Sequence, residues 1–308
     1  MISKIEKYYK EFRNYCEFWN LNLAIKAVIL PKLLNNLEFK HKAILSYLED
    51  NYSDIINKYR IIGSRTEHLT DDCPIWICWF QGEEQMPLLV KKCLETVRKN
   101  KERHTVNVIT FDNYKKYVSI PQFIIDKVRR NEISLTHFSD IIRNNLLADH
   151  GGIWLDATIY LTCKLKGWDL PFYTIKQNRP DDHIYVSGYK WTGFCMGGVK
   201  GNPLNSFVKD FFNEYHKREK CLIDYFLIDY VIALGYKNIL AIKELIDVVP
   251  YSNPDLYYIQ KNMTKPVDKN KLKQVFESTS IFKLTYKFKQ PQDRNTLYYF
   301  LGFGDENN

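Results

Sequence analysis

The chain has 308 residues, of which 45% are apolar, so it can bury a sizeable core in one large domain with appendages or in two modest domains. Its formal net charge of +8 favours anionic partners such as a nucleoside diphosphate, an anionic membrane surface or a nucleic acid, without choosing among them. The seven scattered cysteines form neither a CxxC pair nor a zinc-binding spacing with histidine. We therefore expect reduced thiols in a cytoplasmic protein.

Residues 1–70 are predicted to form a helical, amphipathic extension that ends in a linker over residues 63–72. The first ten residues lack the apolar block of a signal peptide, and no apolar run approaches about 18 residues, which argues against a spanning helix. The most apolar stretch covers residues 18–31, where Pro31 is expected to end or kink a helix. We favour packing of this helix on the rest of the chain over a position on the inner membrane leaflet with Trp19 at the interface.

From Pro74 onward, alternating strand and helix patterns predict an α/β sheet. Residues 75–80 form an apolar run that ends in a glycine turn, and residues 105–111 are rich in β-branched side chains. Amphipathic helices are predicted to follow each strand, starting at residues 86 and 121. No GxGxxG or Walker pattern follows the first strand, which argues against dinucleotide and P-loop folds.

The stretch from Ser139 to Thr162 organises the rest of the chain. Ser139 is predicted to cap a helix that carries Asp140 at its positive end, and two glycines at positions 151 and 152 stop that helix. Residues 153–155 are a short apolar run typical of a strand covered on both faces. Asp156 follows this strand directly, where a carboxylate is unfavourable unless a partner such as a divalent cation binds it.

The neighbours of Asp156 carry compatible polar groups. Asp140 and Arg143 share one helix face, and Arg143 offers a fork of donors for hydroxyl, phosphate or carboxylate groups. Thr158 returns to the same side of an extended chain as Asp156, with a hydroxyl oxygen for a metal or its water. Taken singly, these residues have ordinary alternatives: a helix cap with a surface ion pair for Asp140 and Arg143, and a turn residue for Asp156.

Residues 172–199 contain short strands and a glycine-rich segment, which either approaches a ligand together with Trp191 or packs as a β-hairpin. Helices are predicted over residues 203–216 and 222–230. The second of these carries Asp224, which is costly to bury in an apolar helix unless it is used, and Asp229, interpreted as a solvent-facing or structural residue.

Near the C-terminus, residues 281–287 alternate so that Lys283, Thr285 and Lys287 fall on one side of an extended strand or loop. Cations placed there beside a leaving diphosphate would stabilise the charge that grows as a glycosyl bond breaks. The alternative for these lysines is a solvated surface, which is the default for the lysines between residues 261 and 273.

The string Ser-Asp-x-x-Arg followed by Gly-Gly-Ile-Trp-Leu-Asp-Ala-Thr resembles the core of the capsular polysaccharide synthesis proteins, which are related to glycosyltransferase family 32 and its DXD sugar-binding region. The resemblance covers residues 74–287. It implies a GT-A-like, Rossmann-type α/β domain over residues 71–308 that binds a nucleoside-diphosphate sugar, UDP-linked, through Mn²⁺ or Mg²⁺. The chain has Asp-Ala-Thr where many relatives carry Asp-x-Asp, so the metal ligands expected here are Asp156 and Thr158.

The same resemblance implies a retaining glycosyltransferase of capsular repeat-unit synthesis, with a lipid-linked oligosaccharide at the inner membrane face as acceptor and the leaving phosphate as base. The expected contacts are with the donor sugar for Asp140 and Arg143, with the base for Trp79, Phe80 and Gln81, with the sugar or acceptor for Asp224, and with the diphosphate for Lys283, Thr285 and Lys287.

Three other interpretations remain open at this point. A nucleic-acid-binding protein suits the charge, but the sequence lacks an RNP, KH, zinc or helix-turn-helix pattern, so we expect no nucleic-acid partner. A glycoside hydrolase needs two opposed carboxylates, and no evident pair occurs beyond Asp156 and a distant acid. An inactive relative of the transferases would explain the missing second aspartate.

Overall fold

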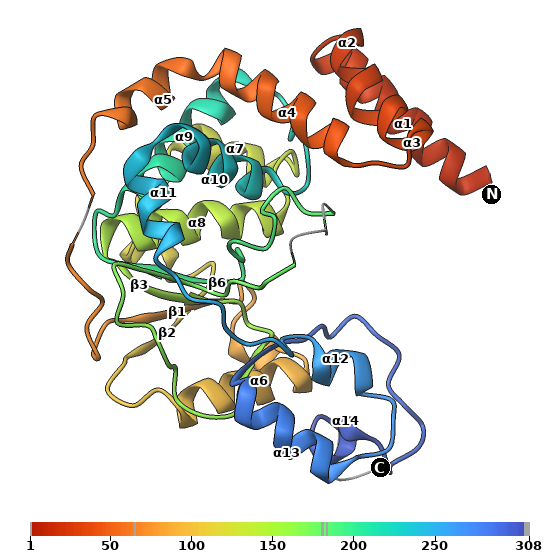
Figure 1. Cartoon of the computed structure of the whole chain (residues 1–308), viewed down its shortest axis with the longest axis vertical. Coiled ribbons are helices and arrows are strands. Elements are labelled where there is room, and N and C mark those ends of the chain that lie inside the picture. The colour runs from red at the N-terminus through yellow and green to blue at the C-terminus, as the bar shows by residue number, and fades with distance from the viewer. Residues whose placement is uncertain (1, 65, 180–181, 183, 305–308) are drawn as a thin grey trace.

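The computed structural model describes residues 2–64, 66–179, 182 and 184–304. Its centre is a five-stranded sheet between two groups of helices (Figure 1). The strands are β1 (Ile75–Cys78), β2 (Val106–Ile109), β3 (Gly152–Leu155), β5 (Phe172–Thr174) and β6 (Cys195–Gly198). Their order is β2-β1-β3-β6-β5, with β1 parallel to β2 and β3, and β6 antiparallel to β3 and β5. The predicted α/β class is confirmed.

Side chains alternate along the strands between two hydrophobic clusters. Trp76 and Trp154 face the helices α8 (Leu135–Asp149), α9 (Pro203–Arg218) and α10 (Leu227–Asn238). Ile75, Ile77 and Ile153 face α6 (Leu88–Lys99) on the other side. The central strands are therefore covered on both faces, as their continuous apolar runs predict.

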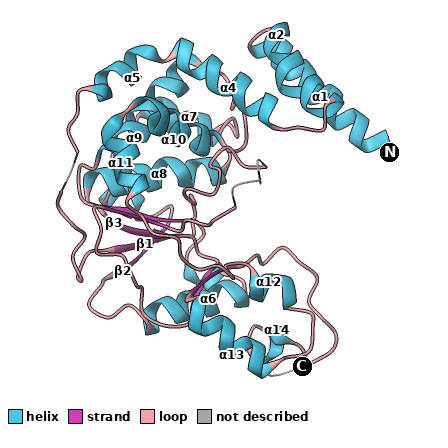
Figure 2. Ribbon diagram, in the orientation of Figure 1, coloured by secondary structure: helices cyan, strands magenta, loops and turns pink. Residues whose placement is uncertain are grey.

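A second, two-stranded sheet joins β4 (Ile159–Leu161) to β7 (Ile281–Lys283) in antiparallel register, with Ile159 opposite Lys283. It lies on the α6 side of the central sheet, where the C-terminal helices gather (Figure 2). The remaining helices beyond β1 are α7 (Gln122–Arg129), α11 (Leu240–Asp247), α12 (Tyr258–Asn262), α13 (Lys269–Ser278) and α14 (Leu297–Phe300). This pairing brings the C-terminal lysine segment to the end of β3.

The N-terminal helices are α1 (Ile2–Phe18), α2 (Leu21–Ala24), α3 (Leu30–Leu33), α4 (Glu38–Asn51) and α5 (Ser53–Arg60). A π-helical segment, Ile25–Ile29, connects α2 to α3, so the chain changes its helical register just before Pro31, which cannot donate a backbone hydrogen bond. The helix α4 packs on α10 and α5 packs on α9, and Tyr52, between α4 and α5, lies 4.7 Å from Phe211 of α9 between ring centroids. No helix in the described part of the chain is long and apolar enough to cross a membrane.

Two predicted helix starts are wrong. The helix α8 begins at Leu135 with Ser134 as its N-cap, because the Ser134 side chain accepts the His137 amide, and Ser139 lies inside the helix. The helix α10 begins at Leu227 rather than at residue 222, because the Asp224 side chain accepts the Phe226 amide and forms a turn before the helix.

Candidate active site

Three segments far apart in sequence meet at one edge of the central sheet. The strands β1 and β3 are parallel neighbours, so Trp79 after β1 and Asp156 after β3 emerge at the same edge. The pairing of β4 with β7 adds Lys283 from the C-terminal part of the chain. Gly151 precedes β3 and Gly152 opens it, both with positive φ, and a Cβ on Gly152 would clash with the carbonyl oxygen of Pro74.

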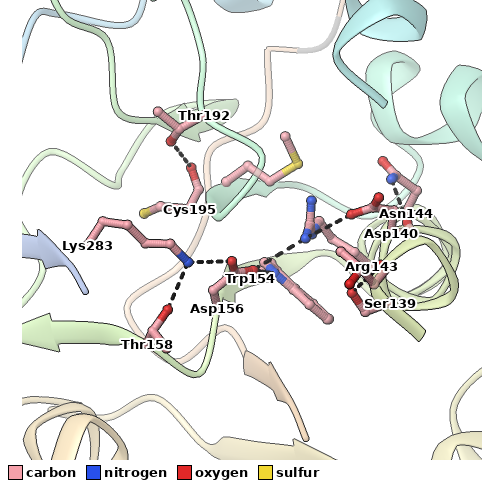
Figure 3. A network of polar contacts seen from close by, with 12 residues as sticks. Ser139, Asp140, Arg143, Asn144, Trp154, Asp156, Thr158, Thr192, Cys195 and Lys283 are labelled. Atoms are coloured by element: carbon pink, nitrogen blue, oxygen red, sulfur yellow. Dashed lines mark hydrogen bonds and ion pairs between the residues drawn. The ribbon is translucent and has the colours of Figure 1, made fainter. Parts of the chain in front are cut away.

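Charged side chains alternate in sign along this edge (Figure 3). The Arg143 guanidinium lies 3.2 Å from Asp140 and 3.3 Å from Asp156. The other carboxylate oxygen of Asp156 accepts a 2.6 Å bond from the Lys283 ammonium, which also donates to the Thr158 hydroxyl at 2.8 Å. We call Asp140, Arg143, Asp156 and Lys283 the charge network. Its two negative and two positive formal charges sum to zero, and each carboxylate lies beside a cation.

The Asp156 carboxylate is held in its ionised form. Burial alone would raise the pKa of this group, but the Lys283 ammonium and the Arg143 guanidinium lower the pKa to about 2. The indole of Trp154 adds a 2.9 Å hydrogen bond to Asp156 and places its ring 4.9 Å from the Arg143 guanidinium carbon. Asp156 therefore acts as a fixed anion that orients two cations.

A cavity of about 510 Å³ lies over the charge network. Arg143, Asp156 and Lys283 line it, and so do Trp79 and Tyr286, whose rings meet edge to face with centroids 5.5 Å apart. Within the described residues, the buried Nε1 of Trp79 and the buried Nε of Arg143 have no hydrogen-bond partner. Both atoms are buried beneath the cavity wall, and buried N–H groups are rarely left unpaired.

The other residues expected at the base and the diphosphate also line this cavity. Gln81 is exposed at its rim, whereas Phe80 is buried and packs between Phe111 and Phe138 at centroid distances of 4.7 and 5.2 Å. Thr285 and Lys287 lie beside Lys283 along the wall, although β7 itself ends at Lys283. Phe80 is therefore mainly a core residue that touches the cavity.

Asp140 lies behind Arg143 and is not among the residues that line the cavity. Only 7% of Asp140 is exposed, and its second oxygen lies 3.5 Å from the His137 ring. Its contacts fit a residue that orients the Arg143 guanidinium.

Asp224 lies away from the charge network. Its carboxylate forms a 2.9 Å ion pair with Lys40 of α4, and it lines a different cavity of about 640 Å³ between the N-terminal helices and α10. The structure therefore does not bring Asp224 together with Asp156.

A third cavity, of about 430 Å³, shares Lys283, Leu284 and Thr285 with the first. It contains Trp191, whose indole donates a 2.8 Å hydrogen bond to Asp229. Burial raises the pKa of Asp229 to about 6, against the effect of the Trp191 bond. Of the two interpretations of Asp229, solvent-facing or structural, its partly buried position and the Trp191 bond fit the structural one. The sequence signal for such a residue is an aspartate within a mostly apolar helix. From the sequence, this signal is assigned to Asp224, although the residue inside the helix is Asp229.

A comparison with protein families matches residues 30–301 to the family described as capsular polysaccharide synthesis protein. The chain belongs to this family. One similar solved structure is the PaToxG Glycosyltransferase, which is 15% identical, with 65% of this chain and 78% of that chain covered at a TM-score of 0.42. No curated protein matches the chain.

In this member of the capsular polysaccharide synthesis family, a divalent cation is expected on Asp156 and Thr158. The hydrogen bonds that these two residues already accept show whether their oxygens are free to bind one. Both ligand oxygens already contact the Lys283 ammonium, and the second Asp156 oxygen accepts from Arg143 and Trp154. The described residues contain no group of three or more His, Cys, Asp or Glu side chains that could hold a metal ion. A single carboxylate that is already paired with two cations does not fit a divalent metal centre.

Proposed function

We propose that this protein is a glycosyltransferase that moves a sugar from a nucleoside-diphosphate donor, UDP-linked, to a glycan acceptor during capsular repeat-unit synthesis. One observation carries the proposal: a partly buried network of alternating charges lies under a cavity at the carboxyl edge of parallel strands, in a chain of the capsular polysaccharide synthesis family. Open α/β sheets bind ligands at this edge. These features fit the donor site of a GT-A-like glycosyltransferase best.

The donor is assigned to the 510 Å³ cavity. Trp79 and Tyr286 offer aromatic faces for the base, with Gln81 at the rim. Lys283 and Lys287 supply positive charge for the diphosphate. The Arg143 guanidinium, which lines the same cavity, would contact a donor hydroxyl or a phosphate oxygen.

The reaction needs charge stabilisation at the bond that breaks. As the bond between the sugar C1 and the β-phosphate oxygen opens, negative charge grows on the diphosphate and cations near it lower the barrier. The acceptor hydroxyl then bonds to C1 and its proton passes to the leaving phosphate, with retention at C1. No base from the protein is required, and Asp156 serves to hold Arg143 and Lys283 in place.

The acceptor is assigned to the 430 Å³ cavity, which meets the donor cavity at Lys283 and holds Trp191. Aromatic side chains offer faces on which sugar rings stack. This cavity shares Tyr185, Phe226 and Asp229 with the 640 Å³ cavity that contains Asp224. An extended glycan would therefore run from Lys283 past Trp191 toward Asp224.

A lipid-linked acceptor lies in the cell membrane, so the enzyme must contact the membrane to reach it. We propose that this protein is cytoplasmic and binds peripherally to the inner face of the membrane. The stretch from α2 through the π-helical segment to α3 buries one side in the core and exposes apolar side chains on another. Figure 1 shows these helices at the N-terminal end of the molecule, away from the central sheet. The exposed apolar side chains are Leu21, Ile25, Ile29 and Leu33, with Lys26 and Lys32 exposed beside them. Such a basic, apolar helix face suits an anionic bilayer surface.

The direct test is turnover. The purified protein is incubated with a panel of nucleoside-diphosphate sugars and lipid-linked acceptors, and release of the nucleoside diphosphate is measured. We expect one donor, UDP-linked, to be consumed in proportion to acceptor glycosylated. For variants that remove a lysine from the site, the matched control is Lys273→Met, which removes the same positive charge from an exposed residue of α13. Absence of both binding and turnover for every donor would contradict the proposal.

A further inference from the structure

The ammonium of Lys283 lies where a cation on Asp156 would have to bind. It is 2.6 Å from one Asp156 oxygen and 2.8 Å from the Thr158 hydroxyl (Figure 3). These are the two oxygens that the Asp-Ala-Thr sequence offers in place of an Asp-x-Asp pair. A divalent metal could reach them only if Lys283 moved away.

Several contacts hold Lys283 in this position. Its backbone belongs to β7, and the register with β4 places it opposite Ile159, one residue beyond Thr158. The Lys283 Nζ lies 5.0 Å from the Phe194 ring centroid, and 20% of its side chain is exposed. A lysine fixed by strand pairing, an ion pair and an aromatic face is a preorganised charge and needs little rearrangement when a ligand binds.

The geometry also leaves Lys283 able to contact a ligand. An ammonium carries three N–H donors, and two of them are directed at Asp156 and Thr158. Lys283 lines both the 510 Å³ and the 430 Å³ cavities, at the junction where the donor and acceptor cavities meet. The third donor is left for an acceptor other than these two oxygens, such as a phosphate oxygen of a ligand in either cavity.

We propose that the Lys283 ammonium takes the place of the divalent cation on Asp156, so that the donor diphosphate binds and reacts without a metal ion. The inference rests on the proposed function, because it concerns the donor of that reaction. In the step, the bond from C1 to the β-phosphate oxygen breaks, and the oxygen keeps the electron pair beside Lys283. The acceptor oxygen bonds to C1, and its proton goes to the phosphate.

The test is binding of UDP to the whole chain, measured by calorimetry after treatment with EDTA and again with added Mn²⁺ or Mg²⁺. We expect the wild-type dissociation constant to change by less than about 2-fold between these buffers, because the cation is built into the chain. Lys283→Met should weaken binding by about 10-fold or more in EDTA, whereas Lys283→Arg should recover part of the affinity. Lys273→Met should bind like the wild type.

A second readout separates a missing cation from a misfolded protein. In Lys283→Met the Asp156 and Thr158 oxygens are exposed to ions, so added Mn²⁺ should strengthen UDP binding by this variant and not by the wild type. Wild-type binding that requires Mn²⁺ or Mg²⁺ would overturn the inference and leave the proposed function standing. Wild-type affinity in Lys283→Met under EDTA would also overturn it. Absence of UDP binding to the wild type in every buffer would overturn both.

Discussion

The two cavities that meet at Lys283 differ in chemistry. The 510 Å³ cavity is lined by Arg143, Asp156 and Lys283 of the charge network, whereas the 430 Å³ cavity is mostly apolar and is lined by the rings of Trp191, Phe194 and Tyr257. Charge suits a diphosphate, and aromatic faces suit neutral sugar rings. This edge of the sheet thus has a charged half and a mostly apolar half with one lysine between them, which is the basis for assigning the donor to the first and the acceptor to the second.

The two half-buried aspartates of these cavities show the same difference. Asp156 lies beside two cations, which lower its pKa to about 2 in spite of burial. Asp229 is raised to a pKa of about 6 by burial, and the neutral indole of Trp191 offsets that only in part. The same residue type thus supplies a permanent anion in one cavity and a titrating group in the other.

The largest expected effect is that of Asp156→Asn. Loss of this charge frees Arg143 and Lys283 from their shared anchor, so donor turnover should fall by about 100-fold or more. The fold should persist, because the amide keeps the shape of the side chain and can still accept a hydrogen bond from Trp154. Release of nucleoside diphosphate and circular dichroism check the two parts, and wild-type turnover in the variant would contradict the assignment.

A smaller effect is expected from the aromatic residues, and it should differ between the cavities. Trp79→Ala should weaken binding of UDP by about 10-fold, because stacking of a base on an aromatic ring contributes about 1–3 kcal/mol. Trp191→Phe removes the hydrogen bond to Asp229 and should raise the KM for acceptor while the Kd for UDP stays unchanged. Equal effects of both variants on UDP binding would show that the cavities do not divide the substrates.

The pH dependence of stability should separate the two aspartates. The folded pKa of Asp229 lies above its ordinary value of 3.8, so its contribution to stability is present below about pH 4 and is lost as the pH rises through about 6. Wild-type protein should therefore lose about 1–3 kcal/mol of unfolding free energy relative to Asp229→Asn between pH 4 and pH 7.

The same comparison for Asp156→Asn should be flat over this range, because Asp156 has a pKa of about 2 and stays ionised. Urea unfolding at intervals of pH measures both differences. A flat difference for Asp229→Asn would mean that the carboxylate is solvated in the folded protein.

The smallest effects are expected at the periphery. Asp224→Asn should change acceptor KM only a few-fold and leave UDP binding intact, since Asp224 lies in the 640 Å³ cavity and pairs with Lys40. Leu33→Asp should reduce sedimentation with anionic vesicles without a change in turnover of a water-soluble acceptor. A drop in UDP affinity for Asp224→Asn would place this residue in the donor site after all.

Sequence patterns predicted much of the central sheet because its signals are local. The apolar runs before Trp79 and Asp156 marked β1 and β3, and the helix-and-glycine pattern placed Arg143 near Asp156. The division into residues 1–70 and 71–308 stays a prediction, although α4 and α5 share the main hydrophobic cluster with α9 and α10.

The missing parts depend on contacts between distant segments. Nothing in the sequence shows that β7 pairs with β4, so the 2.6 Å contact of Lys283 with Asp156, 127 residues away, could not be foreseen. The N-cap at Ser134 was missed because Ser139 has the same side chain and stands nearer the apolar repeat. The buried position of Asp229 could not be predicted, because its hydrogen-bond partner, Trp191, belongs to a different segment of the chain.

The most direct test of the charge network as a donor site is the affinity of the wild-type protein for UDP, measured by calorimetry beside Asp156→Asn and Trp79→Ala. The account predicts saturable binding of one UDP per chain that weakens in both variants. Equal binding to all three proteins, or binding to none of them in any buffer, would contradict it.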